Sequence, residues 1–256
     1  MTTSVSINHP QPLHVQVRHV PSRRSLEWLL RGWTDLRAIG WAGLAHGALI
    51  TILGGVLLML GSTHLYLTAA AVTGYLLVGP IMTTGACELA RRREAREPIG
   101  FDESLQALSR NPSGLLHFGG VLALIAVLWF VLSAILLGSV LSSPVPSLAV
   151  ALWGGSALMS LSQLLAYLGC GAVLAVIVFA LSVVSVPLII DRHATATDAI
   201  RASLQVTISN LPAMLAWAAL IVAVTAIGFL TLLVGMVLIA PLLGYATWHA
   251  YRDLIA

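Results

Sequence analysis

Residues 114–141 read GLLHFGGVLALIAVLWFVLSAILLGSVL and contain no Arg, Lys, Asp or Glu. A helix rises about 1.5 Å per residue, so this run can cross a hydrocarbon core of about 30 Å. The whole chain has the same character, because 58% of its 256 residues are hydrophobic and 9% are charged. Soluble domains average about 25% charged residues. The sequence therefore predicts an all-α, polytopic membrane helical bundle.

Six apolar segments predict six transmembrane helices. They cover residues 41–61, 66–87, 114–141, 166–190, 211–230 and 232–251. The last two form one apolar stretch of roughly forty residues, which is too long for one crossing, and we divide it near 229–231. Residues 1–24 are polar and are predicted to form a flexible cytoplasmic tail without a cleavable signal peptide, leaving 25–256 as the membrane domain.

Arginine placement predicts the orientation. All 13 basic residues are arginine, and they lie at 18–37, 91–110, 192, 201 and 252, whereas the connections 62–65, 142–165 and 229–231 contain no Arg, Asp or Glu. By the positive-inside rule both termini are cytoplasmic. Residues 147–168 are also apolar, but a seventh span there would move Arg192 outside. We therefore interpret 147–168, with Ser160, Ser162 and Gln163, as an outer-leaflet or re-entrant helix.

A threefold internal repeat is predicted over residues 25–92, 103–193 and 198–254. Each unit has a short amphipathic helix, a span, and a returning span that carries Pro80, Pro187 or Pro241. The short helices are expected to lie flat at the cytoplasmic interface. Each proline removes one backbone hydrogen bond, which shapes the bundle by a kink or, as in some transporters, opens a substrate-coordinating break.

The predicted spans contain histidines and no carboxylate or arginine. His46, His117 and His249 lie toward the cytoplasmic side, where imidazoles could ligate haem or copper, relay a proton, or form interhelical hydrogen bonds. Without a Cys-x-x-Cys-His motif or a histidine-rich cluster, we predict no cofactor and keep haem or copper as an alternative. Cys87 and Cys170 lie in apolar stretches and are interpreted as packing residues.

The polar residues at the ends of two predicted spans are interpreted as structural or interfacial. These are Asp191 and Arg192 after the fourth span, and Trp248, Arg252 and Asp253 at the end of the sixth. No Gly-x-Ser-x-Gly, nucleotide-binding loop or His-Glu-x-x-His motif occurs, so the chain is not predicted to be an enzyme. A formal net charge of +3 argues against nucleic-acid binding.

Three strings resemble domain-of-unknown-function family 2189, which comprises predicted bacterial integral membrane proteins. They are LLRGWTDL at 29–36, FALSVVSVPLIIDR at 179–192 and PLLGYATWHAYRD at 241–253, and the resemblance runs from about residue 22 to the end. It implies a location in the bacterial inner membrane. Some members are labelled as cytochrome c oxidase subunits, but the histidine constellation of a haem–copper core is absent from this sequence.

Three hypotheses follow from these observations. The first is a non-enzymatic accessory or assembly component of a larger membrane complex, a respiratory complex being one candidate, with the lipid bilayer and other inner-membrane proteins as partners. The second is a transporter or channel for a small solute, which would require a polar cavity lined by Thr73, Tyr75, Ser182 and Ser185. The third is a haem- or metal-binding redox protein that uses the three histidines.

Overall fold

The computed structural model describes residues 15–61, 65–137, 160–231 and 233–256. Over these residues it is built from helices, and the only β-type pairing described is an isolated antiparallel bridge between Val17 and Ile255. The helices are α1 (Arg24–Ile39), α2 (Trp41–Gly61), α3 (Leu65–Met82), α4 (Thr84–Ala95), α5 (Phe101–Arg110), α6 (Pro112–Leu137), α7 (Leu161–Ser182), α8 (Ser185–Arg192), α9 (Ala196–Ser209), α10 (Leu211–Leu230) and α11 (Met236–Leu254).

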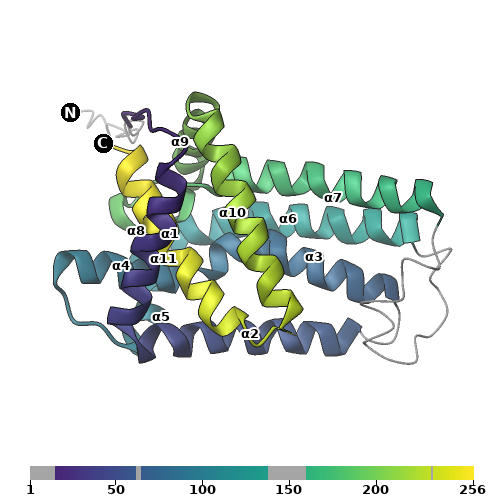
Figure 1. The fold of residues 1–256 in the computed structure, drawn as a ribbon, viewed down its shortest axis with the longest axis horizontal. Helices are drawn as coiled ribbons and strands as arrows, with labels where there is room; N and C mark the ends of the chain where they lie inside the picture. Colours follow the sequence, from purple (N-terminus) through teal and green to yellow (C-terminus); the bar gives the residue numbers. More distant parts are fainter. Residues whose placement is uncertain (1–14, 62–64, 138–159, 232) are drawn as a thin grey trace, which may run out of the picture.

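The helices are arranged in two groups. In Figure 1, α2, α3, α6 and α7 run side by side along the long axis, and α10 and α11 cross that direction obliquely. The short helices α1, α4, α5, α8 and α9 gather at one end, which also holds the C-terminus. Helix α11 joins the two groups, since it packs against α1, α2 and α4.

Four of the six predicted spans correspond to helices that are long and apolar enough to cross a membrane. Within the described residues these cover Trp41–Met59, Pro112–Leu136, Leu161–Arg192 and Leu211–Leu230. Within the described residues, α3 and α11 are not among these four helices. Helix α11 ends in a polar turn that contains Arg252 and Asp253. The predicted division of the last apolar stretch agrees with the end of α10 at Leu230.

The fourth predicted span begins earlier than the sequence suggested, which corrects the separate helix expected at 147–168. Residues 161–168 form the first turns of α7, and Ser160 caps this helix. The Ser160 side chain accepts a hydrogen bond from the Gln163 backbone, and the Gln163 side chain accepts one from the Ser160 backbone. This capping box satisfies helix donors that have no partner within the helix. Residues 147–159 lie outside the described part.

Two returning helices are divided, and a third is continuous. Helix α3 contains Pro80 and ends at Met82, after which α4 begins at Thr84. Helix α7 ends at Ser182, and α8 begins two residues before Pro187. The sequence prediction gave each segment as one span with a kink or a break at its proline, and both divisions lie within five residues of that proline. Helix α11 continues through Pro241, as expected for a proline that removes one hydrogen bond and bends the helix without ending it.

Residues 15–20 are attached to the C-terminus, although the sequence placed them in a flexible tail. The Arg18 backbone N–H donates to the Leu254 carbonyl at 2.9 Å, and the Ala256 N–H donates to the Gln16 carbonyl at 3.0 Å. Asn210 adds a second attachment, because its Oδ1 accepts from the Val20 N–H and its Nδ2 donates to the Arg18 carbonyl. Residues 1–14 lie outside the described part.

Candidate functional site: a charge network at one end of the bundle

The charged side chains gather at one end of the molecule. None of α2, α3, α6, α7 or α10 contains Arg, Asp or Glu. We define the charged end as α1, α4, α5, α8, α9 and the last two turns of α11, and the apolar half as the parts of α2, α3, α6 and α7 that extend away from it (Figure 1). Ion pairs between carboxylates and arginines connect the helices of the charged end to one another.

Glu88 of α4 is the most enclosed carboxylate of the charged end, with a side-chain exposure of 0%. Arg91 binds it in a bidentate manner at 2.8 and 2.9 Å, and Arg92 donates to it at 2.9 Å. The Arg110 guanidinium of α5 lies 3.6 Å from the same carboxylate and also donates to the Ile190 carbonyl of α8. Glu88 thus connects α4, α5 and α8. Such enclosure requires paired charges, because an isolated buried ion is very unfavourable.

Glu97 extends this cluster toward solvent. Its carboxylate accepts hydrogen bonds from Arg91 at 2.7 and 3.0 Å. These bonds hold the pKa of the Glu97 carboxyl below its ordinary value. The bonds from Arg91 to Glu88 and Glu97 in turn raise the pKa of the Arg91 guanidinium. The hydrogen bonds favour the charged form of each partner.

Asp35 of α1 forms a second carboxylate site between α4 and α11. Its exposure is 6%, and it is paired with Arg93 of α4. The His249 Nε2 of α11 lies 2.7 Å from the other carboxylate oxygen. The three helices therefore meet at one buried carboxylate. Asp35 is the protein partner of the His249 ring.

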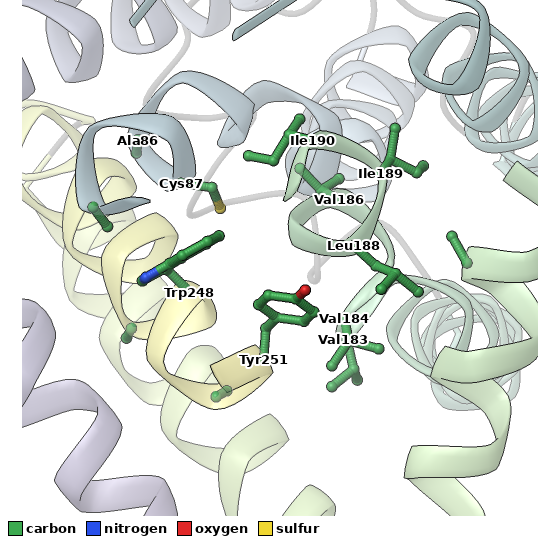
Figure 2. Close-up of a cluster of buried hydrophobic side chains, with 14 of the residues drawn as sticks. Ala86, Cys87, Val183, Val184, Val186, Leu188, Ile189, Ile190, Trp248 and Tyr251 are labelled. Atoms are coloured by element: carbon green, nitrogen blue, oxygen red, sulfur yellow. The ribbon is translucent and has the colours of Figure 1, made fainter. Parts of the chain in front are cut away.

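Indole and phenol groups attach α11 to its neighbours. Figure 2 shows Trp248 and Tyr251 projecting from α11 among side chains of α4 and α8. The Trp248 Nε1–H donates to Glu94 of α4 at 2.8 Å, and the Tyr251 hydroxyl donates to Asp191 of α8 at 2.6 Å. Both aromatic side chains are buried. Trp248, which the sequence interpretation assigned a structural or interfacial role, is buried among these helices.

The C-terminal residues complete the attachments. Asp253 accepts a hydrogen bond from the Trp28 Nε1–H of α1 at 2.9 Å and lies 3.4 Å from the Arg31 guanidinium. Arg252 donates to Glu94 at 3.0 Å. Arg192, at the end of α8, is half-buried beside Asp191. Trp28 also contacts Trp217 of α10 edge to face, with centroids 5.8 Å apart, so α10 is included in this assembly.

Glycines allow the helices of this end to approach closely. A Cβ on Gly32 of α1 would lie 2.9 Å from the backbone of α11, and one on Gly244 of α11 would contact Ala86 of α4. A Cβ on Gly47 of α2 would overlap the Val237 carbonyl oxygen of α11. Pro241, four residues after Val237, cannot donate to that carbonyl. The small residue and the proline thus meet at the same contact between α2 and α11.

The other two candidate histidines have protein partners of their own. His46 of α2 is buried, and its Nε2 lies 3.1 Å from the Met82 carbonyl while its Nδ1 lies 3.3 Å from the Ser104 hydroxyl. His117 of α6 is exposed and bonds to the Ser113 carbonyl of its own helix at 2.7 Å. Within the described residues, no group of three or more His, Cys, Asp or Glu has a geometry that could hold a metal ion.

The hydroxyl groups considered for a transport path are hydrogen-bonded to other groups of the chain. The Tyr75 hydroxyl of α3 donates to the Ile50 carbonyl of α2 at 2.8 Å. Ser182 and Ser185 donate to carbonyls one turn earlier, at the division between α7 and α8. Thr73 accepts from the Trp129 indole of α6. Cys87 donates to the Gly244 carbonyl at 3.3 Å, which agrees with the packing role expected from its apolar surroundings.

Sequence reasoning missed Glu88 and Asp35, the two most enclosed carboxylates of the network. For Glu88 a signal was present, because Arg91 and Arg92 follow at the i+3 and i+4 positions that share a helix face. Asp35 had no such signal. Its partners Arg93 and His249 lie 58 and 214 residues away in the sequence.

The comparisons with known proteins agree with a membrane assignment. No curated protein and no solved structure matches the chain. A family model described as a predicted integral membrane protein (DUF2189) matches residues 67–191, which run from α3 to α8. The resemblance noted from the sequence is thereby confirmed over these residues. Residues 67–191 are thus similar to this family of predicted integral membrane proteins.

Proposed function

We propose that this protein is a non-enzymatic component of the bacterial inner membrane that acts as an accessory or assembly subunit of a larger membrane complex. The observation that carries the proposal is the low burial of its apolar helices. In the most apolar 18-residue segment of Pro112–Leu136, only 17% is buried by the rest of the described chain. The corresponding share for Leu211–Leu230 is 22%. Large side chains such as Leu124, Val127 and Leu215 therefore face outward.

Glycines in the apolar half favour contact with another helix over contact with lipid alone. A Cβ on Gly55, Gly74, Gly79, Gly120 or Gly169 would meet nothing within 4 Å. Glycine in a helix interior is less favourable than alanine by about 1 kcal/mol, so it is retained where a close approach requires it. Small residues are typical of the contacts between transmembrane helices. These glycines have no such role within the described chain, and a partner helix would supply one.

The ion pairs of the charged end are a second observation that supports the assembly proposal. Glu88, Asp35, Glu94, Asp191 and Asp253 all have partners that attach helices to one another. Removing one partner of such a buried pair is strongly destabilising, so these carboxylates tie the relative positions of the helices to one another. A rigid end that orients exposed apolar helices is suited to assembly.

The proposed topology has six spans in three hairpins, with both termini in the cytoplasm. The order of elements supports it, because a short helix precedes a long one and a returning helix in α1–α4, α5–α8 and α9–α11. Maleimide labelling of intact cells tests the orientation. A Val234→Cys variant, which lies in the exposed connection before α11, should react with an impermeant reagent, and Ser22→Cys should react only after the membrane is opened. The reverse pattern would overturn the topology.

The assembly proposal is tested by mild extraction and quantitative mass spectrometry of co-purifying proteins. We expect specific partners with the wild type and their loss with a Gly120→Leu, Gly169→Leu variant, because a large side chain blocks close helix approach. The matched control is Val127→Leu, Val176→Leu, which enlarges outward side chains of the same two helices. A wild-type protein that is always recovered alone, with the mass of one chain, would overturn the proposal. So would equal recovery of partners with both variants.

A further inference from the structure

The three short helices α1, α5 and α9 carry large apolar side chains on their outward faces. The buried face of α1 holds Trp28 and Leu36 beside Ser25 and Gly32, and the buried faces of α5 and α9 are made mostly of small residues such as Ser104, Ala107, Ala199 and Ser203. Their outward faces carry large apolar residues, including Leu26, Leu30, Trp33, Leu105, Leu108 and Ile208. A surface helix in water turns charged and polar residues outward instead. These outward faces therefore favour contact with a partly apolar surface over contact with water.

The outward face of α1 is the best defined of the three. Leu26, Leu30, Trp33 and Arg37 follow one another at spacings of four, three and four residues and form a single exposed stripe. Gly40, with a φ of 60°, then turns the chain into α2. This backbone conformation is readily adopted only by glycine. The turn is followed directly by Trp41, whose exposure is 78%.

Arg37 gives this stripe a positive end. Its guanidinium carbon lies 5.1 Å from the centroid of the Trp33 ring. In the described part of the chain no carboxylate comes within ion-pair distance of Arg37, in contrast to Arg31 on the same helix, which pairs with Asp253. A guanidinium stacked on an indole keeps its N–H edge available for a bidentate oxyanion such as a phosphate. Trp and Arg together also favour the headgroup layer of a membrane.

We propose that the stripe of α1, together with Trp41, binds an acidic phospholipid of the cytoplasmic leaflet. Arg37 contacts the phosphate, and Leu30, Trp33 and Trp41 contact the upper part of the acyl chains. Charge complementarity selects this occupant, since an unpaired guanidinium borders an apolar stripe and the chain carries 13 arginines against 10 acidic residues. The inference uses the proposed cytoplasmic orientation of the charged end and does not depend on the proposed assembly role.

The test uses the purified full-length protein in vesicles of phosphatidylcholine and phosphatidylglycerol, with one of the two lipids brominated on its acyl chains. Quenching of tryptophan emission is compared for the wild type and Trp33→Phe, and the difference reports the lipid next to Trp33. We expect brominated phosphatidylglycerol to be preferred about fivefold at low salt. The preference should fall toward unity in about 0.5 M NaCl, because exposed charges are then screened.

Two variants separate a local site from general attraction. Arg37→Gln should remove the preference for phosphatidylglycerol near Trp33. Arg96→Gln, which removes the same charge at the exposed end of α4, should leave it unchanged. Equal quenching of wild-type Trp33 by both lipids at low salt would overturn the proposal. Quenching by aqueous acrylamide but by neither lipid would overturn it too, and would assign the stripe to solvent or to a protein partner. Recovery of partner proteins in the assembly test has no bearing on these outcomes.

Discussion

The charged end and the apolar half differ in how their glycines are used. At the charged end, Gly32 and Gly244 lie where a Cβ would meet another helix. In the apolar half, Gly54 and Gly171 lie against aromatic side chains, but Gly55, Gly120 and Gly169 face open space. The helices of the charged end therefore pack closely against one another. The helices of the apolar half leave part of their surfaces uncovered by the described chain. The difference indicates that one sequence encodes a self-sufficient platform and a set of helices whose outer surfaces are covered by lipid or protein.

The largest expected effect comes from the enclosed carboxylate of the charged end. Glu88→Gln removes the charge that neutralises Arg91, Arg92 and Arg110, and should lower the free energy of unfolding by about 3–5 kcal/mol. Denaturant titration in detergent, followed by the emission of the buried tryptophans, measures the change. Glu97→Gln is the control, since its side chain is 39% exposed and binds only one of these arginines. Equal stability of the two variants would show that Glu88 does not hold the platform together.

Alanine substitutions at two glycines of α2 compare a glycine that packs against α11 with one that faces open space. Gly47→Ala places a Cβ on the Val237 carbonyl of α11, and backbone cannot move aside as a flexible side chain can. We expect a loss of about 3 kcal/mol. Gly55→Ala, two turns later, meets no atom and should be neutral or stabilise the helix by up to about 1 kcal/mol. Similar losses in the two variants, measured by the same titration, would remove the distinction between packed and open glycine positions.

The sequence predicted the apolar half better than the charged end. Apolar runs and proline or arginine boundaries placed α2, α6 and α10 closely, because each depends on local composition. The start of α7 was missed although Ser160 and Gln163 carry a capping-box signal. These residues were interpreted as a polar stripe on another helix.

Most of the charged end could not have been predicted from one sequence. Trp28 meets Asp253 across 225 residues, and Asn210 meets Val20 across 190. Periodicity identifies which face of a helix is apolar, but it does not identify the partner of a polar group. The same limit applies to the inward positions of α1, where Gly32 is required only because α11 lies against it.

A tyrosine hydroxyl donates a hydrogen bond to another helix in each of the two regions, and removing each hydroxyl allows the two bonds to be compared. Tyr251→Phe removes a donor to the Asp191 carboxylate at the charged end, and should cost about 1.5–2 kcal/mol because the acceptor is ionised. Tyr75→Phe removes a donor to the Ile50 carbonyl in the apolar half and should cost about 1 kcal/mol. Unfolding midpoints of the two variants in one detergent give the comparison. A larger loss for Tyr75→Phe would mean that the ionised acceptor contributes little.

The smallest effect is the pH dependence at the outer edge of the charge network. Arg91 holds the pKa of the Glu97 carboxyl below its ordinary value of 4.5. A carboxyl with a depressed folded-state pKa contributes stability above the ordinary value, and this contribution is lost as the pH falls through the folded-state pKa. The small difference in unfolding midpoint between the wild type and Glu97→Gln should therefore be constant near pH 7 and shrink below pH 4.5.

Glu103→Gln is the matched control for this pH dependence, because no guanidinium of the described residues pairs with Glu103. The expected effect is small since an ion pair near solvent gains little net energy. The two regions then differ in a further respect, because only the charged end has carboxylates whose protonation can change the attachment of one helix to another. A difference that persisted unchanged below pH 4 would show that Glu97 contributes through packing and not through its charge.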